Sequence, residues 1–190
     1  MKKKIAVFAS GSGSNAEKIF EHFKSHPNIE VSLLLCNKPG AFVLERAEKF
    51  EVPNQVFNRK ALNDPEGVLA LLQQHQIDWI VLAGFLLLVP PSLVAAYPNR
   101  IVNIHPALLP KYGGKGMYGM NVHNAVKAAG EKESGITIHY VNSRYDEGNI
   151  IDQFACQLSP EDSPETIAKK VQKLEHENYP KVIENVVLKY

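Results

Sequence analysis

The sequence predicts an α/β fold with a Rossmann-like, mostly parallel sheet, helices on both faces, C-terminal antiparallel strands and a closing helix. Short apolar segments alternate with segments whose apolar residues recur at helical spacing. Those apolar segments lack the polar alternation of a half-exposed strand, which indicates a parallel sheet covered on both faces. Beyond about residue 105 the pattern changes, and two strand-like segments are expected to form an antiparallel pair that extends the sheet.

The predicted elements follow one another in a regular order. The strands are expected over residues 4–10, 31–37, 55–57, 77–85, 100–104, 135–141 and 149–158. The first helix is predicted from Ala16, Ile19, Phe20 and Phe23, which fall at helical spacing, and further helices are expected around residues 41–50, 65–75, 91–96 and 121–129. The last helix is expected to begin near residues 162–163, and Pro180 to kink or divide it.

Composition and charge exclude several functional classes. With 190 residues, of which 45% are hydrophobic, the chain suits one sizeable domain. The formal net charge is only +1, and the charged residues are scattered along the chain. This argues against a stripe of basic residues that binds nucleic acid and against a basic patch that binds membranes. The longest apolar stretch, residues 77–89, contains Asp78 and is too short to span a bilayer. Only Cys36 and Cys156 occur, so no disulfide framework and a cytoplasmic location are expected. Small-molecule partners are expected, and monomer and homodimer both remain open.

The segment GSGSN, residues 11–15, follows the first predicted strand and opens the first helix. Free N–H groups at a helix N-terminus, two hydroxyl groups and glycines that permit close approach form an anion cradle. A glycine turn that merely caps the helix explains the segment about equally well. Residues 36–38, at the end of the second strand, offer no carboxylate for an adenosine ribose, so a phosphomonoester is favoured over a dinucleotide.

The segment NIHPALLP, residues 103–110, places an amide and an imidazole two residues apart. Because side chains alternate along a strand, Asn103 and His105 project from the same face, and Pro106 then ends the strand. Two polar groups held side by side at the end of a buried strand indicate a site. The Leu109–Pro110 bond is predicted to be cis, because a sharp turn is needed there.

Two further segments are candidates for the same edge of the sheet. Residues 86–89 follow a central strand, where open α/β sheets bind ligands, and they offer backbone groups and an apolar wall to a flat ligand. Residues 145–148, YDEG, follow the strand that carries His139. Spacing alone favours a solvated turn at residues 145–148. It does not decide whether His139 belongs to the site or has only a structural role. The remaining histidines lack metal-ligand spacing, so no metal is expected.

Taken together, six segments resemble one family. ASGSGSN, VLAGF, NIHPALLPKY, GITIHYV, YDEG and VQKLEHENYP occur in order between about residues 4 and 183, and the set resembles the phosphoribosylglycinamide formyltransferases, folate-dependent enzymes of purine biosynthesis. An aspartate 41 positions after the histidine of NIHPALLP resembles the signature of formyl-transferring folate enzymes. GSGSN favours the glycinamide ribonucleotide enzymes over methionyl-tRNA formyltransferase.

The resemblance implies a single formyltransferase domain over residues 1–190. Its nucleotide- and phosphate-binding half would span about residues 1–100, and its folate-binding and catalytic part about residues 101–190. It also implies the reaction. 10-Formyltetrahydrofolate, as the formyl-donor cosubstrate, transfers its formyl group to the amine of N1-(5-phospho-D-ribosyl)glycinamide in the pathway to IMP.

The resemblance also implies site residues, matched position by position. Asn103, His105 and Asp146 match the catalytic trio. Gly13, Ser14 and Asn15 match the loop for the substrate phosphate, and Glu175 matches a carboxylate at the substrate ribose. The residues matched to folate binding are Leu86, Leu87, Leu88, Val89, Asn103, Asn142, Ser143, Arg144 and Tyr145.

The sequence departs from the family pattern in two places. Leu87 stands where better-known members have an arginine, so backbone groups would have to hold the pterin. A family arginine near the folate tail has no clear counterpart, Arg59 or Lys60 being the nearest candidates. The glycine-rich loop of residues 113–119 is expected to act as a mobile cover.

The expected mechanism passes through a tetrahedral intermediate with negative charge on the formyl oxygen. Asn103 and a protonated His105 would each donate a hydrogen bond to that oxygen, and one such donor is worth about 3–4 kcal/mol of barrier. Asp146 is expected to raise the pKa of His105 and to orient its ring. The alternatives are a formyltetrahydrofolate deformylase, a dinucleotide-dependent oxidoreductase and a non-catalytic nucleotide sensor.

Overall fold

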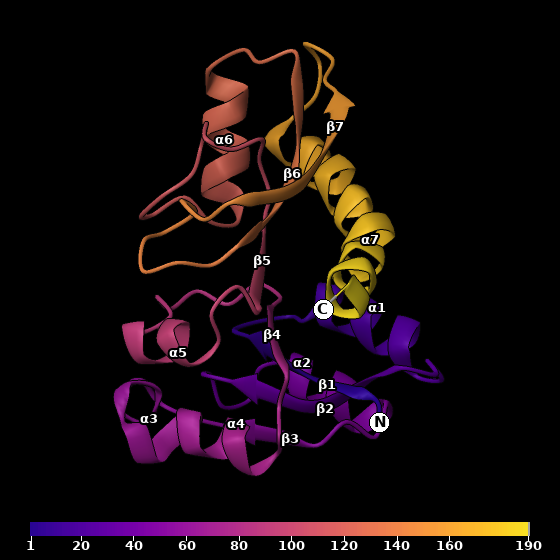
Figure 1. Ribbon diagram of the computed structural model, residues 1–190. Coiled ribbons are helices and arrows are strands. Elements are labelled where there is room, and N and C mark those ends of the chain that lie inside the picture. The colour runs from indigo at the N-terminus through magenta and orange to yellow at the C-terminus, as the bar shows by residue number, and fades with distance from the viewer. Residues whose placement is uncertain (190) are drawn as a thin grey trace.

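A seven-stranded sheet runs through the structure, a computed structural model that describes residues 1–189 (Figure 1). The strand order is β3-β2-β1-β4-β5-β6-β7. Strands β1 to β5 are parallel, whereas β6 pairs antiparallel with both β5 and β7. The strands are β1 (Lys3–Ala9), β2 (Ile29–Cys36), β3 (Asn54–Val56), β4 (Trp79–Leu82), β5 (Ile101–His105), β6 (Glu133–Tyr140) and β7 (Ile150–Gln157). The predicted mostly parallel sheet with C-terminal antiparallel strands is confirmed.

Helices cover both faces of the sheet, as predicted. One face carries α1 (Ser14–Phe23), α2 (Val43–Lys49), α6 (Met120–Ala128) and α7 (Pro164–Lys189). The other carries α3 (Arg59–Asn63), η1 (Pro65–Leu69), α4 (Ala70–Gln74) and α5 (Pro91–Ala96). Because side chains alternate along a strand, Val7 of β1 enters the first apolar core and Phe8 enters the second.

The helix predicted over residues 65–75 is interrupted at Gly67, whose φ of −95° and ψ of −116° are not helical. A separate helix that the sequence reading missed, α3, precedes it, and the Asn58 Oδ1 atom caps α3 by accepting a hydrogen bond from the Ala61 N–H at 2.9 Å. A Cβ atom at residue 67 would lie 2.1 Å from the Ala61 carbonyl oxygen. The close approach of these two segments therefore requires glycine.

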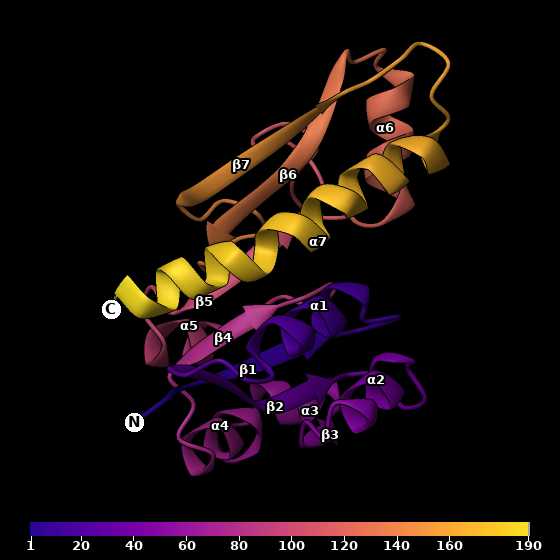
Figure 2. The same ribbon diagram turned by 90° about the vertical axis from the view of Figure 1, so that its right-hand side faces the viewer.

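Helix α7 lies between α1 and the β6–β7 pair and contacts both, as well as α6 and β5 (Figure 2). Pro180 lies inside this helix and does not divide it, contrary to one of the two expected outcomes. Tyr179 and Ile183, on either side of the proline, are fully buried. Their burial offsets the loss of one backbone hydrogen bond, so tertiary packing carries the helix through.

The hydroxyl group of Tyr179 fastens α7 to the centre of the sheet. It donates to the carbonyl oxygens of Leu82, at 2.8 Å, and Val102, at 3.2 Å. Leu82 is the last residue of β4, and Val102 is the second residue of β5. Burial raises the pKa of Tyr179 well above its ordinary value, so the phenol stays protonated and remains a donor. One side chain thus holds two neighbouring strands and the C-terminal helix together.

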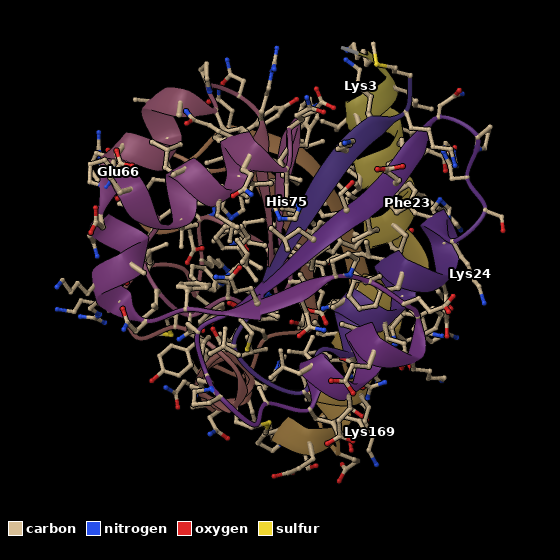
Figure 3. All side chains as sticks on the ribbon, turned by 90° about the horizontal axis from the view of Figure 1, so that it is seen from below. Lys3, Phe23, Lys24, Glu66, His75 and Lys169 are labelled. Atoms are coloured by element: carbon tan, nitrogen blue, oxygen red, sulfur yellow. The ribbon has the colours of Figure 1, made fainter. Side chains whose placement is uncertain are left out.

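The surface carries charges on several sides. Lys24, Glu66 and Lys169 are exposed and lie at different edges of the molecule (Figure 3).

Within residues 1–189, no helix combines the length and the apolar character needed to cross a membrane.

We predict that Tyr179→Phe lowers the free energy of unfolding by about 1–3 kcal/mol, because both strand carbonyls lose their shared buried donor. Urea denaturation measures the change. Tyr118→Phe is the matched control. Tyr118 is 53% exposed, so loss of its hydroxyl group should change the free energy of unfolding by less than about 0.5 kcal/mol. Equal effects of the two substitutions would contradict the assignment.

A candidate active-site cleft

A cleft of about 720 Å³ opens at the carboxyl ends of the central strands. Its walls come from the segments after β4 and within β5, from the glycine-rich loop before α6, from the loop after β6 and from one face of α7. Ligands of open α/β sheets bind at this edge, and the volume lies in the range typical of small-molecule sites. The expected site residues that line the cleft are Asn15, Leu86, Leu87, Leu88, Val89, Asn103, His105, Arg144, Tyr145, Asp146 and Glu175.

The three residues matched to catalysis meet in this cleft. His105 Nδ1 lies 3.5 Å from Asp146 Oδ2, although the residues are 41 positions apart. Asn103 Nδ2 lies 3.2 Å from His139 Nε2, and the same His139 nitrogen lies 3.6 Å from Asp146 Oδ1. Asp146 is held in place by the Gly114 N–H, which donates to its Oδ2 atom at 2.9 Å. One carboxylate therefore stands between two imidazole rings.

The His105 ring faces a hydrogen-bond acceptor at each nitrogen. Its Nε2–H donates to the Tyr112 carbonyl oxygen at 2.7 Å, and its Nδ1 faces the Asp146 carboxylate. A neutral ring with its hydrogen on Nε2 would point a lone pair at that carboxylate, whereas the protonated ring satisfies both acceptors. The surroundings of the ring are therefore arranged for the imidazolium.

Burial nevertheless decides whether the pKa of His105 lies above or below its ordinary value. It lowers the pKa of His105, and although Asp146 and the Tyr112 carbonyl raise that pKa, the outcome is a value below the ordinary 6.5. Asp146 raises the pKa of His105, as expected, but it offsets only part of the desolvation, so the expectation that the carboxylate keeps the ring protonated in the free protein is corrected. Burial raises the pKa of Asp146, but His139, His105 and the Gly114 N–H lower it by more, so Asp146 is ionised at neutral pH.

Two further histidines line the cleft. His139 is 2% exposed and donates from Nδ1 to the Tyr140 carbonyl at 2.9 Å, which turns its Nε2 toward Asn103 and Asp146. The sequence left its role open, because only the β5–β6 pairing places it opposite Asn103. His123, on α6, was not singled out by the sequence, and its buried Nδ1 has no partner within the described residues. Burial and the nearby His105 lower the pKa of His123.

The loop of residues 11–15 is held rigidly between β1 and α1. Gly13 has a φ of +73°, and a Cβ atom there would lie 2.3 Å from Val43 Cγ2, so only glycine fits. The Val43 N–H donates to the Gly11 carbonyl at 3.2 Å, and Arg46 Nε donates to the Ser12 carbonyl at 2.8 Å. These contacts leave the N-terminus of α1 directed at a smaller cavity of about 250 Å³.

The residues expected at the acceptor site meet across the whole length of the chain. Asn15 Nδ2 donates to Glu175 Oε2 at 2.9 Å, and Gln172 Nε2 donates to Ser14 Oγ at 3.3 Å. The Asn15 Oδ1 atom is buried and has no partner in the described part of the chain. Burial raises the pKa of Glu175, and the bond from Asn15 offsets only part of that effect. Lys38, which the sequence reading did not assign, also lines the smaller cavity.

The segment matched to the pterin offers its backbone to the cleft. Leu86 and Leu88 are exposed at the rim, whereas Leu87, in the place of the family arginine, packs against the second apolar core. Among residues 1–189, the N–H groups of Leu87 and Leu88 have no hydrogen-bond acceptor.

The remaining expectations have mixed outcomes. Residues 114–119 of the glycine-rich loop line the cleft, and the Leu109–Pro110 bond is cis, as predicted. Asn142 does not line the cleft; its Oδ1 accepts from the Arg144 N–H at 2.8 Å and shapes the loop. Ser143 also lies outside the cleft lining, as do Arg59 and Lys60, the candidates for contact with the folate tail.

Within residues 1–189, no group of three or more His, Cys, Asp or Glu side chains is arranged to hold a metal ion.

Comparison with known proteins adds an independent result. The family described as formyl transferase matches residues 3–183. The chain is 40% identical to a phosphoribosylglycinamide formyltransferase of Bacillus subtilis, covering 97% of this chain and 95% of that protein. It is 44% identical to a chloroplastic one of Arabidopsis thaliana, covering 96% of this chain but only 64% of the plant protein. The crystal structure of phosphoribosylglycinamide formyltransferase from Anaplasma phagocytophilum superposes with a TM-score of 0.90 at 33% identity, over 100% of this chain and 89% of that one.

We predict that Asp146→Asn moves the titration of the His105 ring to lower pH. The amide lacks the charge that raises the pKa of His105, while the burial that lowers it remains. Nuclear magnetic resonance titration of the histidine rings measures the midpoint. Asp152→Asn, an exposed aspartate on β7, is the control and should leave it unchanged. A midpoint that stays or rises in Asp146→Asn would refute the coupling.

Proposed function

The chain belongs to the formyl transferase family, and from that membership and the cleft we propose that it transfers the formyl group of 10-formyltetrahydrofolate to the amine of N1-(5-phospho-D-ribosyl)glycinamide. One observation carries the proposal. Residues 86–89 and the Asn103–His105–Asp146 trio line one cleft, and the loop of residues 11–15 lines a smaller cavity that shares Ser12, Asn15, Gly84 and Leu86 with that cleft. The relatives named above support the acceptor, since their names specify phosphoribosylglycinamide.

The acceptor site uses the loop of residues 11–15 for the phosphate. The N–H groups at the start of α1 and the Ser14 hydroxyl bind the phosphate oxygens. Glu175, joined to Asn15, accepts hydrogen bonds from the ribose hydroxyl groups. This arrangement directs the glycyl amine along the cleft toward Asn103.

The donor site uses residues 86–89 and the loop that carries Arg144 and Tyr145. The unoccupied N–H groups of Leu87 and Leu88 bind acceptor atoms of the pterin, and the leucine side chains pack against its apolar parts. Recognition of this kind does not need the arginine that Leu87 replaces, because the backbone carries the hydrogen bonds.

The chemical step requires stabilisation of the formyl oxygen as the amine attacks. Asn103 has two amide hydrogens; one faces His139, and the other is free to donate to that oxygen. When the ring is protonated, the His105 Nδ1–H is the second donor. Its distance of 3.5 Å from Asp146 exceeds the usual 2.7–2.9 Å of a charge-assisted hydrogen bond, so the proton can be shared with a substrate oxygen.

The low pKa of His105 in the free protein fits this role. Negative charge that develops on the formyl oxygen adds to the charge of Asp146, and together they favour the imidazolium over the neutral ring. The attacking amine loses a proton as its bond to the formyl carbon forms, which supplies the proton for the ring, and the folate nitrogen gains one as its own bond to that carbon breaks. The ring therefore stabilises the transition state more than the ground state, which is what raises a reaction rate. Asp146 keeps the ring in place and limits the desolvation cost of its protonation.

We predict that the protein releases tetrahydrofolate from 10-formyltetrahydrofolate only when N1-(5-phospho-D-ribosyl)glycinamide is present, in equimolar amounts with the formylated product. Absorbance of the folate and mass spectrometry of the amine product measure the reaction. Release at the same rate without the amine would instead identify a deformylase. No release under either condition would contradict the proposal.

We predict that Asn103→Ala and His105→Ala each lower kcat on the order of a hundredfold, since each removes one donor to the formyl oxygen. Steady-state kinetics and thermal unfolding are measured together, so that lost chemistry is distinguished from lost folding. Asn28→Ala and His22→Ala, at exposed positions remote from the cleft lining, are the controls. Turnover within about threefold of the unmodified chain would exclude this role for the tested residue.

A further inference from the structure

Ser10 follows β1 directly, and its hydroxyl makes two hydrogen bonds to other segments of the chain. Its side chain is 1% exposed. Its hydroxyl donates to Asn37 Oδ1 at 2.5 Å and accepts from the Leu86 N–H at 3.0 Å. A hydroxyl has one hydrogen and two lone pairs, so the bond to Asn37 directs that hydrogen away from Leu86 and leaves a lone pair facing the amide.

A third contact comes from the backbone of the same residue. The Ser10 N–H donates to the Gly84 carbonyl at 3.1 Å. Gly84 has a φ of +72°, which lets the chain bend sharply after β4. Ser10 therefore holds both ends of the three-residue bend that leads from β4 into residues 86–89, and it joins the ends of β1, β2 and β4 at one buried point.

We propose that Ser10 is a positioning residue for the folate donor: its hydroxyl holds residues 86–89 at a defined distance from the anion-binding loop. The proposal rests on the proposed function, because that function assigns residues 86–89 to the donor and residues 11–15 to the acceptor phosphate. Ser10 immediately precedes the loop and contacts the donor segment directly, so it relates the two substrate sites through one side chain.

The donor segment needs such an anchor. Residues 86–89 lie outside the regular strands and helices, and the side chains of Leu86 and Leu88 are exposed at the rim. Backbone groups that are to recognise a pterin must be held in position by other contacts. The bond from the Leu86 N–H to Ser10 supplies one contact of this kind, and it also means that this N–H is not available to the pterin.

The role predicts a specific kinetic signature for Ser10→Ala. The substitution removes both hydrogen bonds of the hydroxyl, and loss of the one from the Leu86 N–H should raise the KM for 10-formyltetrahydrofolate about fivefold, with the KM for the amine within about twofold and kcat within about threefold. The dissociation constant of tetrahydrofolate, measured by calorimetric titration of the whole protein, should rise by the same factor. Asn37→Ala keeps the Ser10 hydroxyl but frees its hydrogen, so it should give a smaller rise of the same kind.

Ser134→Ala is the matched control. Ser134 is 3% exposed, and its hydroxyl has no hydrogen-bond partner in the described part of the chain. It should leave both KM values and the tetrahydrofolate dissociation constant unchanged. Thermal unfolding of all three variants separates a positional effect from a general loss of stability.

Each outcome decides the question. A rise in the donor constants alone supports the positioning role. Donor constants in Ser10→Ala that match those in Ser134→Ala overturn it, as does an equal rise in both KM values with a matching loss of thermal stability. Absence of formyl transfer by the unmodified chain would count against the proposed function instead, and the tetrahydrofolate titration would still test Ser10; no binding of tetrahydrofolate to the unmodified chain would overturn both.

Discussion

The hydrogen bonds of Tyr179 are the contact on which the arrangement of the cleft depends. The hydroxyl joins α7 to the backbone of Leu82, the last residue of β4, and of Val102, the second residue of β5. The chain leaving β4 becomes the donor segment, and the residue after Val102 is Asn103. Glu175 precedes Tyr179 by one helical turn and so lies on the same side of α7. One buried phenol thus links the segment after β4, the strand that carries Asn103 and the helix that carries Glu175, which are the parts of the site that the proposed function uses.

Within the cleft, burial and charge oppose each other. The site encloses imidazole rings and a carboxylate in a space shielded from water, and desolvation lowers the pKa of His105 despite the neighbouring Asp146. In such surroundings a charge is costly until a partner of opposite sign is present. The free protein holds one such partner, Asp146, and the proposed reaction supplies a second as the formyl oxygen becomes negative. Because protonation of His105 becomes more favourable as charge develops on the formyl oxygen, the ring would stabilise the transition state more than the ground state.

In the proposed function, recognition of both substrates depends largely on backbone groups. Gly13 brings the loop against Val43 and leaves the start of α1 open to an anion, and the sharp bend at Gly84 leaves the N–H groups of Leu87 and Leu88 free. Backbone donors tolerate substitution of the side chains that carry them, which accounts for a leucine in the place of the family arginine. They also require firm anchoring, and the contacts of Arg46 with the loop and of Ser10 with Leu86 serve that need.

Local pattern in the sequence was sufficient for the strands, for most helices and for the pairing of Asn103 with His105 on one face, because alternation and helical periodicity are properties of neighbouring residues. It also indicated the cis bond at Leu109–Pro110. Three features were decided only by tertiary structure. The position of Asp146 beside His105 depends on a turn 41 residues away, the bond between Asn15 and Glu175 joins positions 160 apart, and the helix continues through Pro180 because its flanks are buried. The direction of the His105 pKa shift belongs with them, since desolvation depends on everything that surrounds a group and a sequence shows only what precedes and follows it.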